Sequence, residues 1–413
     1  MISKRLWQFI RLSRELSLRV TLIALLAVLA AALAGLLEPY IPQALEARFG
    51  EDAVMPLLNI LASSMLAVTT FSLSVMVTAH MQAASQVTPR SHRLLLEDST
   101  TQMVLATFLG AFIFALVSII LFRAGAYGPR AAVVVFLFTV VVVTLVVVAI
   151  LRWIEHLSRL GSMDETIRLV EARARGALDL RRVNPSLGAR PMTEDFQVPE
   201  DATPIVAHVG GYVQFIDMPG LAKTAESHGV MIYLAATPGS FVVQGQPLAH
   251  ATGSADTLAD AVRTAYYTSD LRTFDQDASF ALVVLSEIAS RALSPGLNDP
   301  GTAIDVIGRL ERLLSLPVKR LDEADRLAHE RIWAPPMTEA DLLRDAFDAI
   351  ARDGAGMIEV ATRLQAALQT LRKGDDPAMA KAAQIMSRRA LLHAEHALVL
   401  EEDRERVRKM AGR

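Results

Sequence analysis

The sequence predicts an α-helical membrane protein with four transmembrane helices, followed by a mainly α cytoplasmic half that contains a small β module. Two observations carry this prediction. Residues 1–153 contain long runs without a formal charge, whereas charged side chains recur every few positions after them. In the second half, short apolar runs bounded by glycine and proline give way near Ser254 to a helical period of 3.6 residues.

Four apolar segments in residues 1–153 have the length of membrane spans. A helix of about 20 residues, rising about 1.5 Å per residue, crosses the roughly 30 Å hydrocarbon layer. A cleaved signal peptide is the alternative for the first segment, but its uncharged apolar core, residues 20–37, is long and a 19-residue polar leader precedes that core. The expected spans are residues 18–37, 57–79, 103–122 and 131–151.

Charge at the segment ends predicts the orientation. The chain before the first span and after the fourth span is rich in arginine and lysine, whereas the first loop is acidic. Basic flanks favour the cytoplasm, so we expect both chain ends there. The third loop, with Arg123 and Arg130, departs mildly from this rule. No span has an ionisable residue near its centre, which argues against a proton relay or a voltage sensor.

The second span carries hydroxyl side chains along one face, three of them at strict four-residue spacing. Further polar side chains continue this face towards the expected cytoplasmic interface. Such a face packs against another helix, where small side chains allow close approach, or it lines a membrane path, and the sequence leaves both open. This polar stripe comprises Ser63, Thr70, Ser74, Thr78, Gln82, Gln86 and Arg90.

Beyond the spans, composition and period divide the chain further. Four prolines without periodicity mark a linker. In the helical region that begins near Ser254, we expect one helix over 258–268, one from the capping box at Thr338 to Arg372, and a last helix from Asp376 to the C-terminus. The expected parts are a connecting helix at 154–182, the linker at 183–204, the β module at 205–253 and a helical cytoplasmic domain at 254–413.

The β module has the turn-and-strand pattern of a known fold. Residues 238–248, PGSFVVQGQPL, resemble barrel-sandwich domains of the biotinyl and lipoyl type. Such carriers hold their cofactor on a lysine at a hairpin tip, whereas Lys223 lies in LAKTAE, which has a helical pattern. We therefore expect a structural β module and no cofactor.

The stretch RALSPGLNDPGTAIDVIG, residues 291–308, interrupts two helical patterns. Capping explains part of it: Asp299 suits the N-cap and Pro300 the first helical position, as in the Asp376-Pro377 pair elsewhere. A turn does not need so many neighbouring polar groups. With the exposed N–H groups of a helix start, they would suit a small polar or anionic ligand. The candidate ligand-binding residues are Ser294, Asn298, Asp299 and Thr302.

Other chemistry has little support. The chain has no cysteine, which excludes disulfides and thiolate sites, and its net charge of −3 with no basic stripe argues against nucleic acid as a partner. His393 and His396 have a spacing that can bind a metal, but surface histidines on a helix are far commoner, so no metal site is expected. No metalloprotease, serine-hydrolase or phosphate-loop motif occurs, so catalysis is the least supported function.

Three features together identify a family. Four N-terminal spans, a second span ending in QVTPR (86–90) and ALSPGLNDPGTA (292–303) resemble the bacterial membrane protein family called domain of unknown function 2254, and RTFDQD (272–277) also fits this family. The family more often has Phe-Ser between the glutamine and the proline. The resemblance covers essentially the whole chain and implies a multi-pass protein of the bacterial inner membrane. It implies no activity, substrate or catalytic residue.

From these observations we expect an oligomeric channel- or transporter-like protein with a cytoplasmic regulatory domain. The alternative is a membrane-anchored ligand sensor or scaffold without transport activity. The expected partners are the lipid bilayer, further copies of the chain in a homo-oligomer, and a small polar or anionic ligand.

Overall fold

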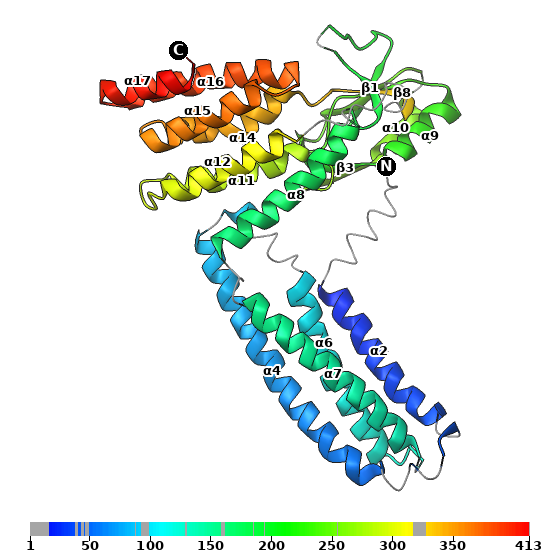
Figure 1. Cartoon of the computed structure of the whole chain (residues 1–413). Coiled ribbons are helices and arrows are strands. Elements are labelled where there is room, and N and C mark those ends of the chain that lie inside the picture. Colours follow the sequence, from blue (N-terminus) through cyan, green and yellow to red (C-terminus); the bar gives the residue numbers. More distant parts are fainter. Residues whose placement is uncertain are drawn as a thin grey trace. The chain divides into compact units, whose positions relative to one another are not determined.

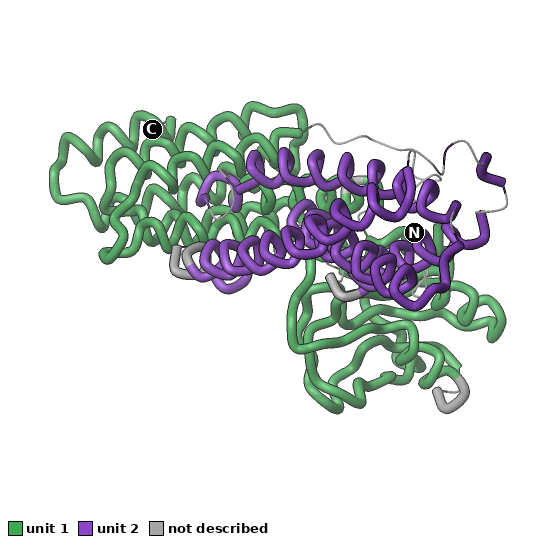
Figure 2. Tube along the Cα trace, turned by 90° about the horizontal axis from the view of Figure 1, so that it is seen from below, with its two compact units in different colours: residues 1–7, 167–413 green, residues 8–166 purple. Residues whose placement is uncertain are grey.

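The computed structural model describes residues 16–37, 40–42, 45, 49–86, 88–91, 99–128, 130–157, 162–184, 186–193, 195–253, 255–316 and 328–412. The chain divides into two compact units, an apolar unit within residues 8–166 and a C-terminal unit that contains residues 167–413 (Figure 2). Each unit has its own hydrophobic core.

The described part of the apolar unit contains four long helices (Figure 1). These are α2 (Leu16–Leu37), α4 (Glu51–Gln86), α6 (Ser99–Arg123) and α7 (Ala131–Leu157). Within them, Val20–Leu37, Glu51–Met81, Thr100–Arg123 and Ala131–Leu157 are long and apolar enough to cross a membrane. The prediction of four membrane-spanning helices is therefore confirmed in length and composition.

The helix α6 lies at the centre of this unit, packed against α2, α4 and α7. Phe108 and Phe114 on α6 are fully buried, and α4 turns Leu58 and Met65 into the same core. The outer faces carry exposed leucine, isoleucine and valine, such as Leu145 on α7. Lipid tails are as apolar as these side chains, so close packing and not burial from water holds such helices together.

The C-terminal unit begins within α8 (Met163–Val183), whose end leads into two sheets. Both sheets are small, and the larger is mixed because β8 pairs in parallel with β1 and β4. The five-stranded sheet has the order β1 (Ala189–Pro191), β8 (His329–Ala334), β4 (Ile232–Leu234), β6 (Pro247–Ala251) and β2 (Thr203–Val206). The three-stranded antiparallel sheet has the order β5 (Phe241–Val242), β3 (Gly211–Ile216) and β7 (Tyr266–Ser269).

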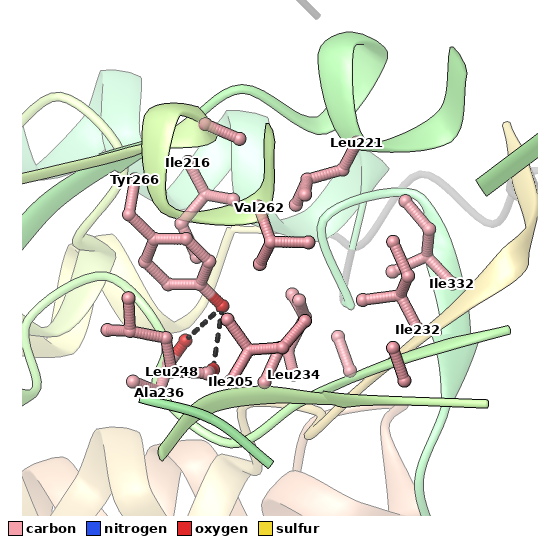
Figure 3. Packing of buried hydrophobic residues seen from close by; sticks show 14 of the residues in the cluster. Ile205, Ile216, Leu221, Ile232, Leu234, Ala236, Leu248, Val262, Tyr266 and Ile332 are labelled. Atoms are coloured by element: carbon pink, nitrogen blue, oxygen red, sulfur yellow. Dashed lines mark hydrogen bonds between the residues drawn. The ribbon is translucent and has the colours of Figure 1, made fainter. Parts of the chain in front are cut away.

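One face of the larger sheet carries an apolar core that also takes in α9 (Met218–His228) and α10 (Ala255–Ala265) (Figure 3). Tyr266 enters this core from β7, and its hydroxyl donates to the carbonyls of Leu248 (2.8 Å) and Ala236 (3.3 Å). Burial raises the pKa of this phenol far above its usual value. The two acceptors satisfy a polar group that would be costly to bury alone.

The remainder is a stack of helices in which α11 packs on α12 and α14, and α15 packs on α12 and α16 (Figure 1). The predicted helix starts are confirmed: Asp299 and Asp376 cap α12 and α16 with a proline in the first turn, and Thr338 with Asp341 forms a capping box. The stack comprises α11 (Ala278–Ala292), α12 (Pro300–Leu314), α14 (Glu339–Asp353), α15 (Ile358–Arg372), α16 (Pro377–Ala397) and α17 (Glu401–Met410).

Three predicted helices differ from the structure. The helix expected over 258–268 ends at Ala265, because the β-favouring residues of Tyr266–Ser269 pair with β3. The helix expected from Thr338 to Arg372 breaks at Gly354, where an added Cβ would lie 2.5 Å from the Val360 side chain. The last helix breaks after Ala397, since the extended Leu398 turns into the core.

Sheet formation reaches beyond the range 205–253. The strands β1 and β2 include residues of the expected linker, and β8 comes from the region expected to be wholly helical. The sequence pattern of each segment is local, whereas pairing with distant strands stabilises these short runs. The structure confirms a small mixed-sheet module, and the barrel-sandwich likeness stays a prediction.

Candidate functional site

The corner between α11 and α12 brings together only part of the predicted ligand site. Asp299 and Thr302 meet: the Thr302 N–H donates to Asp299 Oδ1 (3.1 Å) and the Thr302 hydroxyl donates to Oδ2 (2.6 Å). Ser294 contributes its carbonyl, which accepts the N–H of Leu297 (3.0 Å) and Asn298 (2.8 Å). Asn298 is exposed and has φ of +47°, a left-handed conformation that asparagine tolerates.

These contacts account for most of the polar character of the corner. The hydrogen bonds from Thr302 hold the pKa of Asp299 below its usual value, as expected for a carboxylate that caps a helix. Asp299 is also exposed, and its own N–H returns to the Ala292 carbonyl at 2.8 Å. Thr302, which the sequence left unexplained, is occupied by the cap. A ligand at Ser294 and Asn298 stays a prediction.

The polar stripe of α4 behaves differently. The hydroxyls of Thr70, Ser74 and Thr78 each donate to the carbonyl four residues earlier, at 2.9, 3.0 and 3.0 Å. Ser63 does the same to Asn59 at 2.9 Å, and all four side chains are exposed. Since α4 turns its opposite face into the core of the unit, these hydroxyls point away from the helices of their own chain. Asn59, also exposed, extends the stripe by one turn.

The continuation of the stripe beyond Thr78 is described only in part. Gln82 and Gln86 belong to α4, but their side chains lie outside the part that the structure describes. After α4, a turn forms in which the Ser91 hydroxyl donates to the Thr88 carbonyl at 2.9 Å. Arg90 lies in this turn and is exposed.

The RTFDQD segment, 272–277, forms a polar joint that spacing alone did not reveal. Asp277 is 2% exposed, caps α11 through the N–H of Phe280 (3.0 Å), and binds the Arg272 guanidinium at 2.7 Å. Gln276 binds both backbone groups of Ile216 on β3, at 2.8 and 3.1 Å. The segment therefore fastens the start of α11 to the smaller sheet.

Two further groups lie at this joint. An added Cβ on Gly239, whose φ is +93°, would lie 2.3 Å from Asp277 Oδ2, so this turn approaches the carboxylate as only glycine allows. Arg181, near the end of α8, has its pKa lowered to about 10 because it is buried, an effect that the charge of Asp277 opposes. A glycine turn far away in sequence could have been identified only by knowing that it packs here.

A second ion cluster, around the buried carboxylate of Glu171, joins α8 to α12. Glu171 on α8 is 6% exposed and receives Arg312 through two nitrogens, with Nε 2.8 Å from Oε1. Arg309, itself paired with Asp305, donates to Oε2 at 3.2 Å. A planar guanidinium fork suits such two-pronged contact. The helix that follows the last span is thereby fixed to the helix that begins at the corner.

The histidines of the last helices gather no metal-binding set. His393 and His396 lie on α16, and their neighbour Glu395 binds Arg408 at 2.6 Å. In the ranges that the structure describes, no three histidine, aspartate or glutamate side chains come close enough to hold a metal ion.

Comparison with known proteins identifies relatives without a stated activity. The chain is 28% identical over 373 residues to an uncharacterized protein of Mycobacterium bovis and to an uncharacterized protein of Mycobacterium tuberculosis, and the alignment covers 86% of this chain and 71% of each relative. No solved structure matches. Residues 13–370 match the family described as predicted membrane protein, DUF2254. Because that match covers well over half of the sequence, the chain belongs to the DUF2254 family of predicted membrane proteins.

Proposed function

We propose that this protein is an oligomeric channel- or transporter-like membrane protein whose C-terminal unit is a cytoplasmic regulatory domain. The observation that carries the proposal is the exposed polar stripe of α4. Its hydroxyls lie on the face opposite Leu58 and Met65, which pack in the core of the apolar unit. A face of this kind is suited to meet another copy of the chain or water.

Back-bonding satisfies only the donor of each hydroxyl. Thr70, Ser74 and Thr78 keep acceptor capacity after donating to their own helix, and an asparagine amide such as that of Asn59 has two donors and an acceptor. Hydrocarbon offers these groups nothing, so exposure to lipid has a free-energy cost that a neighbouring helix or a water-filled path removes. Closed rings of identical subunits bring the same face of every copy to one axis.

Single cysteines test the proposal directly, because the chain contains no cysteine. We expect Ser74→Cys, reconstituted in liposomes, to react with a membrane-impermeant thiol reagent, and we expect that reaction to reduce ion or solute flux. Leu145→Cys on α7 is the matched control, since Leu145 also lies in a span, is 55% exposed, and has the exposed apolar side chains of Val141 and Val148 one turn away on either side. It should not react.

The outcomes separate the alternatives. Disulfide-linked dimers of the Ser74→Cys protein without labelling or flux would support a packed helix contact and contradict a path. Absence of labelling, cross-linking and flux would contradict both the oligomer and the path.

The proposal places both chain ends in the cytoplasm of a bacterial cell, with the apolar unit in the inner membrane. Support comes from the basic residues that flank the first and last spans. In right-side-out vesicles, Asp52→Cys in the first turn of α4 should be labelled from outside and Gly412→Cys should not. Labelling of both from the same side would contradict the topology.

A membrane-anchored sensor or scaffold is the second candidate. It is favoured by the compactness of the C-terminal unit, which has cores of its own in the sheet module and the helical stack. This function predicts ligand binding without any flux. A protein that conducts or transports would contradict the sensor as the whole function.

A further inference from the structure

An unbroken row of side chains crosses the five-stranded sheet. Cross-strand register pairs Arg190 on β1 with Trp333 on β8, Trp333 with Tyr233 on β4, and Tyr233 with His250 on β6. His250 in turn pairs with Pro204 on β2. Partners in register project from the same side of a sheet, so one guanidinium, two aromatic rings and one imidazole lie on one face.

This row lies on the face of the sheet opposite the core. The residues that alternate with it, Ile232 and Leu234 on β4 and Ile332 on β8, are buried in the core cluster and project towards α9 and α10 (Figure 3). Arg190, Trp333 and His250 are only half-buried. We call this the aromatic face.

The chain after β1 lies over the aromatic face. The Phe196 ring stacks on Trp333, with centroids 4.5 Å apart and planes inclined by 26°, and lies 5.9 Å from the Tyr233 ring. The same segment is acidic, with Asp195, Glu200 and Asp201. Burial, and then the charge of Asp201, raise the pKa of Tyr233, so carboxylate charge reaches this face. The covering segment therefore presents a flat ring beside negative charge.

Arg190, beneath this covering segment, makes a cation–π contact but leaves one of its hydrogen-bond donors without an acceptor among the described residues. Its guanidinium carbon lies 5.6 Å from the centre of the Trp333 ring, a cation–π contact. Its Nε is buried without a hydrogen-bond partner among the described residues. A buried donor without an acceptor is rare in a folded protein, because it forfeits a hydrogen bond to water. An anionic ligand would supply the missing acceptor.

We propose that the aromatic face binds a nucleotide, with the base stacked on Trp333 and the phosphate at the neighbouring Arg190, and that Phe196 with its acidic segment occupies this site when the ligand is absent. A base is planar and stacks on aromatic rings, and a phosphate is the anion that arginine binds through its planar fork. The covering segment has the same two properties, a ring and a negative charge, so it competes for the site. The inference concerns binding alone and stands whether or not the protein transports anything.

The competition has a measurable consequence. If the covered state predominates, the apparent dissociation constant is the intrinsic one divided by the uncovered fraction, so weakening the cover tightens binding. We expect Phe196→Ala to bind a nucleotide at least about fivefold more tightly than the unaltered chain. If Phe196 has only a structural role, its replacement by alanine should loosen the aromatic face, and the affinity for the nucleotide should not increase.

The test uses the full chain in lipid nanodiscs, with Trp7→Phe and Trp153→Phe so that Trp333 is the only tryptophan of the original three. Its fluorescence is followed while adenosine monophosphate, guanosine monophosphate, adenosine or inorganic phosphate is added, and calorimetry on the unaltered chain provides a second measurement. We expect the monophosphates to quench Trp333 and to bind at least tenfold more tightly than phosphate, with stacking contributing about fivefold or more.

Variants locate the site. Trp333→Leu should abolish binding seen by calorimetry, and Arg190→Gln should weaken the monophosphates while leaving adenosine unchanged. Phe241→Ala is the matched control for Phe196→Ala, because Phe241 is an exposed aromatic ring on the other sheet, and it should not alter binding. Absence of binding to every probe in both the unaltered and the Phe196→Ala chains overturns the proposal. So does equal binding of phosphate and monophosphate, which would show an anion contact without recognition of the base.

Discussion

Asp277 and Asp299 begin consecutive helices of one stack with the same capping contact, yet their surroundings differ. Each uses Oδ1 to accept the backbone N–H three residues later, at 3.0 and 3.1 Å. Asp277 is 2% exposed and gives its second oxygen to Arg272, whereas Asp299 is exposed and gives its second oxygen to the Thr302 hydroxyl. One geometry thus serves a buried ion pair at α11 and a surface cap at α12.

The difference teaches that a distinctive motif and a strongly coupled site need not coincide. The corner at 292–303 has the more unusual sequence, but its carboxylate makes local contacts that any N-cap makes. The RTFDQD segment contains none of the candidate ligand-binding residues, but it joins β3, the Gly239 turn and α11 around one buried carboxylate. Substitutions at the buried cap should therefore cost more than those at the exposed one.

The largest effect is expected for Asp277→Ala. This change removes a cap and leaves the half-buried Arg272 without its carboxylate, and breaking a buried pair costs about 3–5 kcal/mol. The measurement is the free energy of unfolding of the full chain in detergent, obtained from a urea titration that is monitored by tryptophan fluorescence.

Asp376→Ala is the control, because Asp376 caps α16 by accepting the Ala378 N–H (3.0 Å). Its replacement should cost only the stability that an ordinary cap contributes, about 1 kcal/mol. Equal losses at Asp277 and Asp376 would show that the Arg272 pair contributes nothing beyond capping.

Much of the fold could be predicted because its signals are local. Span length depends on uncharged runs, and the starts of α12, α14 and α16 depend on side chains within one turn, such as Asp299 and Thr338. The failures are non-local. The strand at Tyr266–Ser269 pairs with β3, which is far away in sequence, and at Gly354 an added Cβ would lie 3.3 Å from the side chain of Leu293 at the end of α11. No window of sequence contains those partners.

The candidate sites follow the same division. The spacing of Thr70, Ser74 and Thr78 identified a face of α4, and the structure adds that this face points away from its own unit. The aromatic face could not be found from spacing, because its four side chains come from strands scattered between residues 189 and 334. Only sheet register brings Arg190 to Trp333.

An intermediate effect is expected for Gly239→Ala, which attacks the buried cap from the other side. The new Cβ would lie 2.3 Å from Asp277 Oδ2, and alanine would have to adopt φ of +93°, so a loss of about 2–3 kcal/mol is expected. Gly245→Ala separates the two causes: its φ is +88° but nothing lies within 4 Å, so only about 1 kcal/mol of backbone strain is expected. If Gly239→Ala and Gly245→Ala lose the same free energy of unfolding in the urea titration, the close approach to Asp277 is relieved without a measurable loss of stability.

The smallest effect is expected for Asp299→Ala, about 1 kcal/mol at pH 7, and it should depend on pH. Because Thr302 lowers the pKa of Asp299 in the folded chain, the carboxylate stabilises the fold fully above the unfolded pKa of about 4. That stabilisation is lost as the pH falls through the lower, folded pKa. The gap in melting temperature between Asp299→Ala and the unaltered chain should therefore be largest near pH 7 and should shrink by pH 3. A gap in melting temperature that stays constant over this range would show that Asp299 stabilises the corner through packing and not through its charge. The shared capping hydrogen bonds of Asp299 and Asp277 would then not mean that both carboxylates act through their charge.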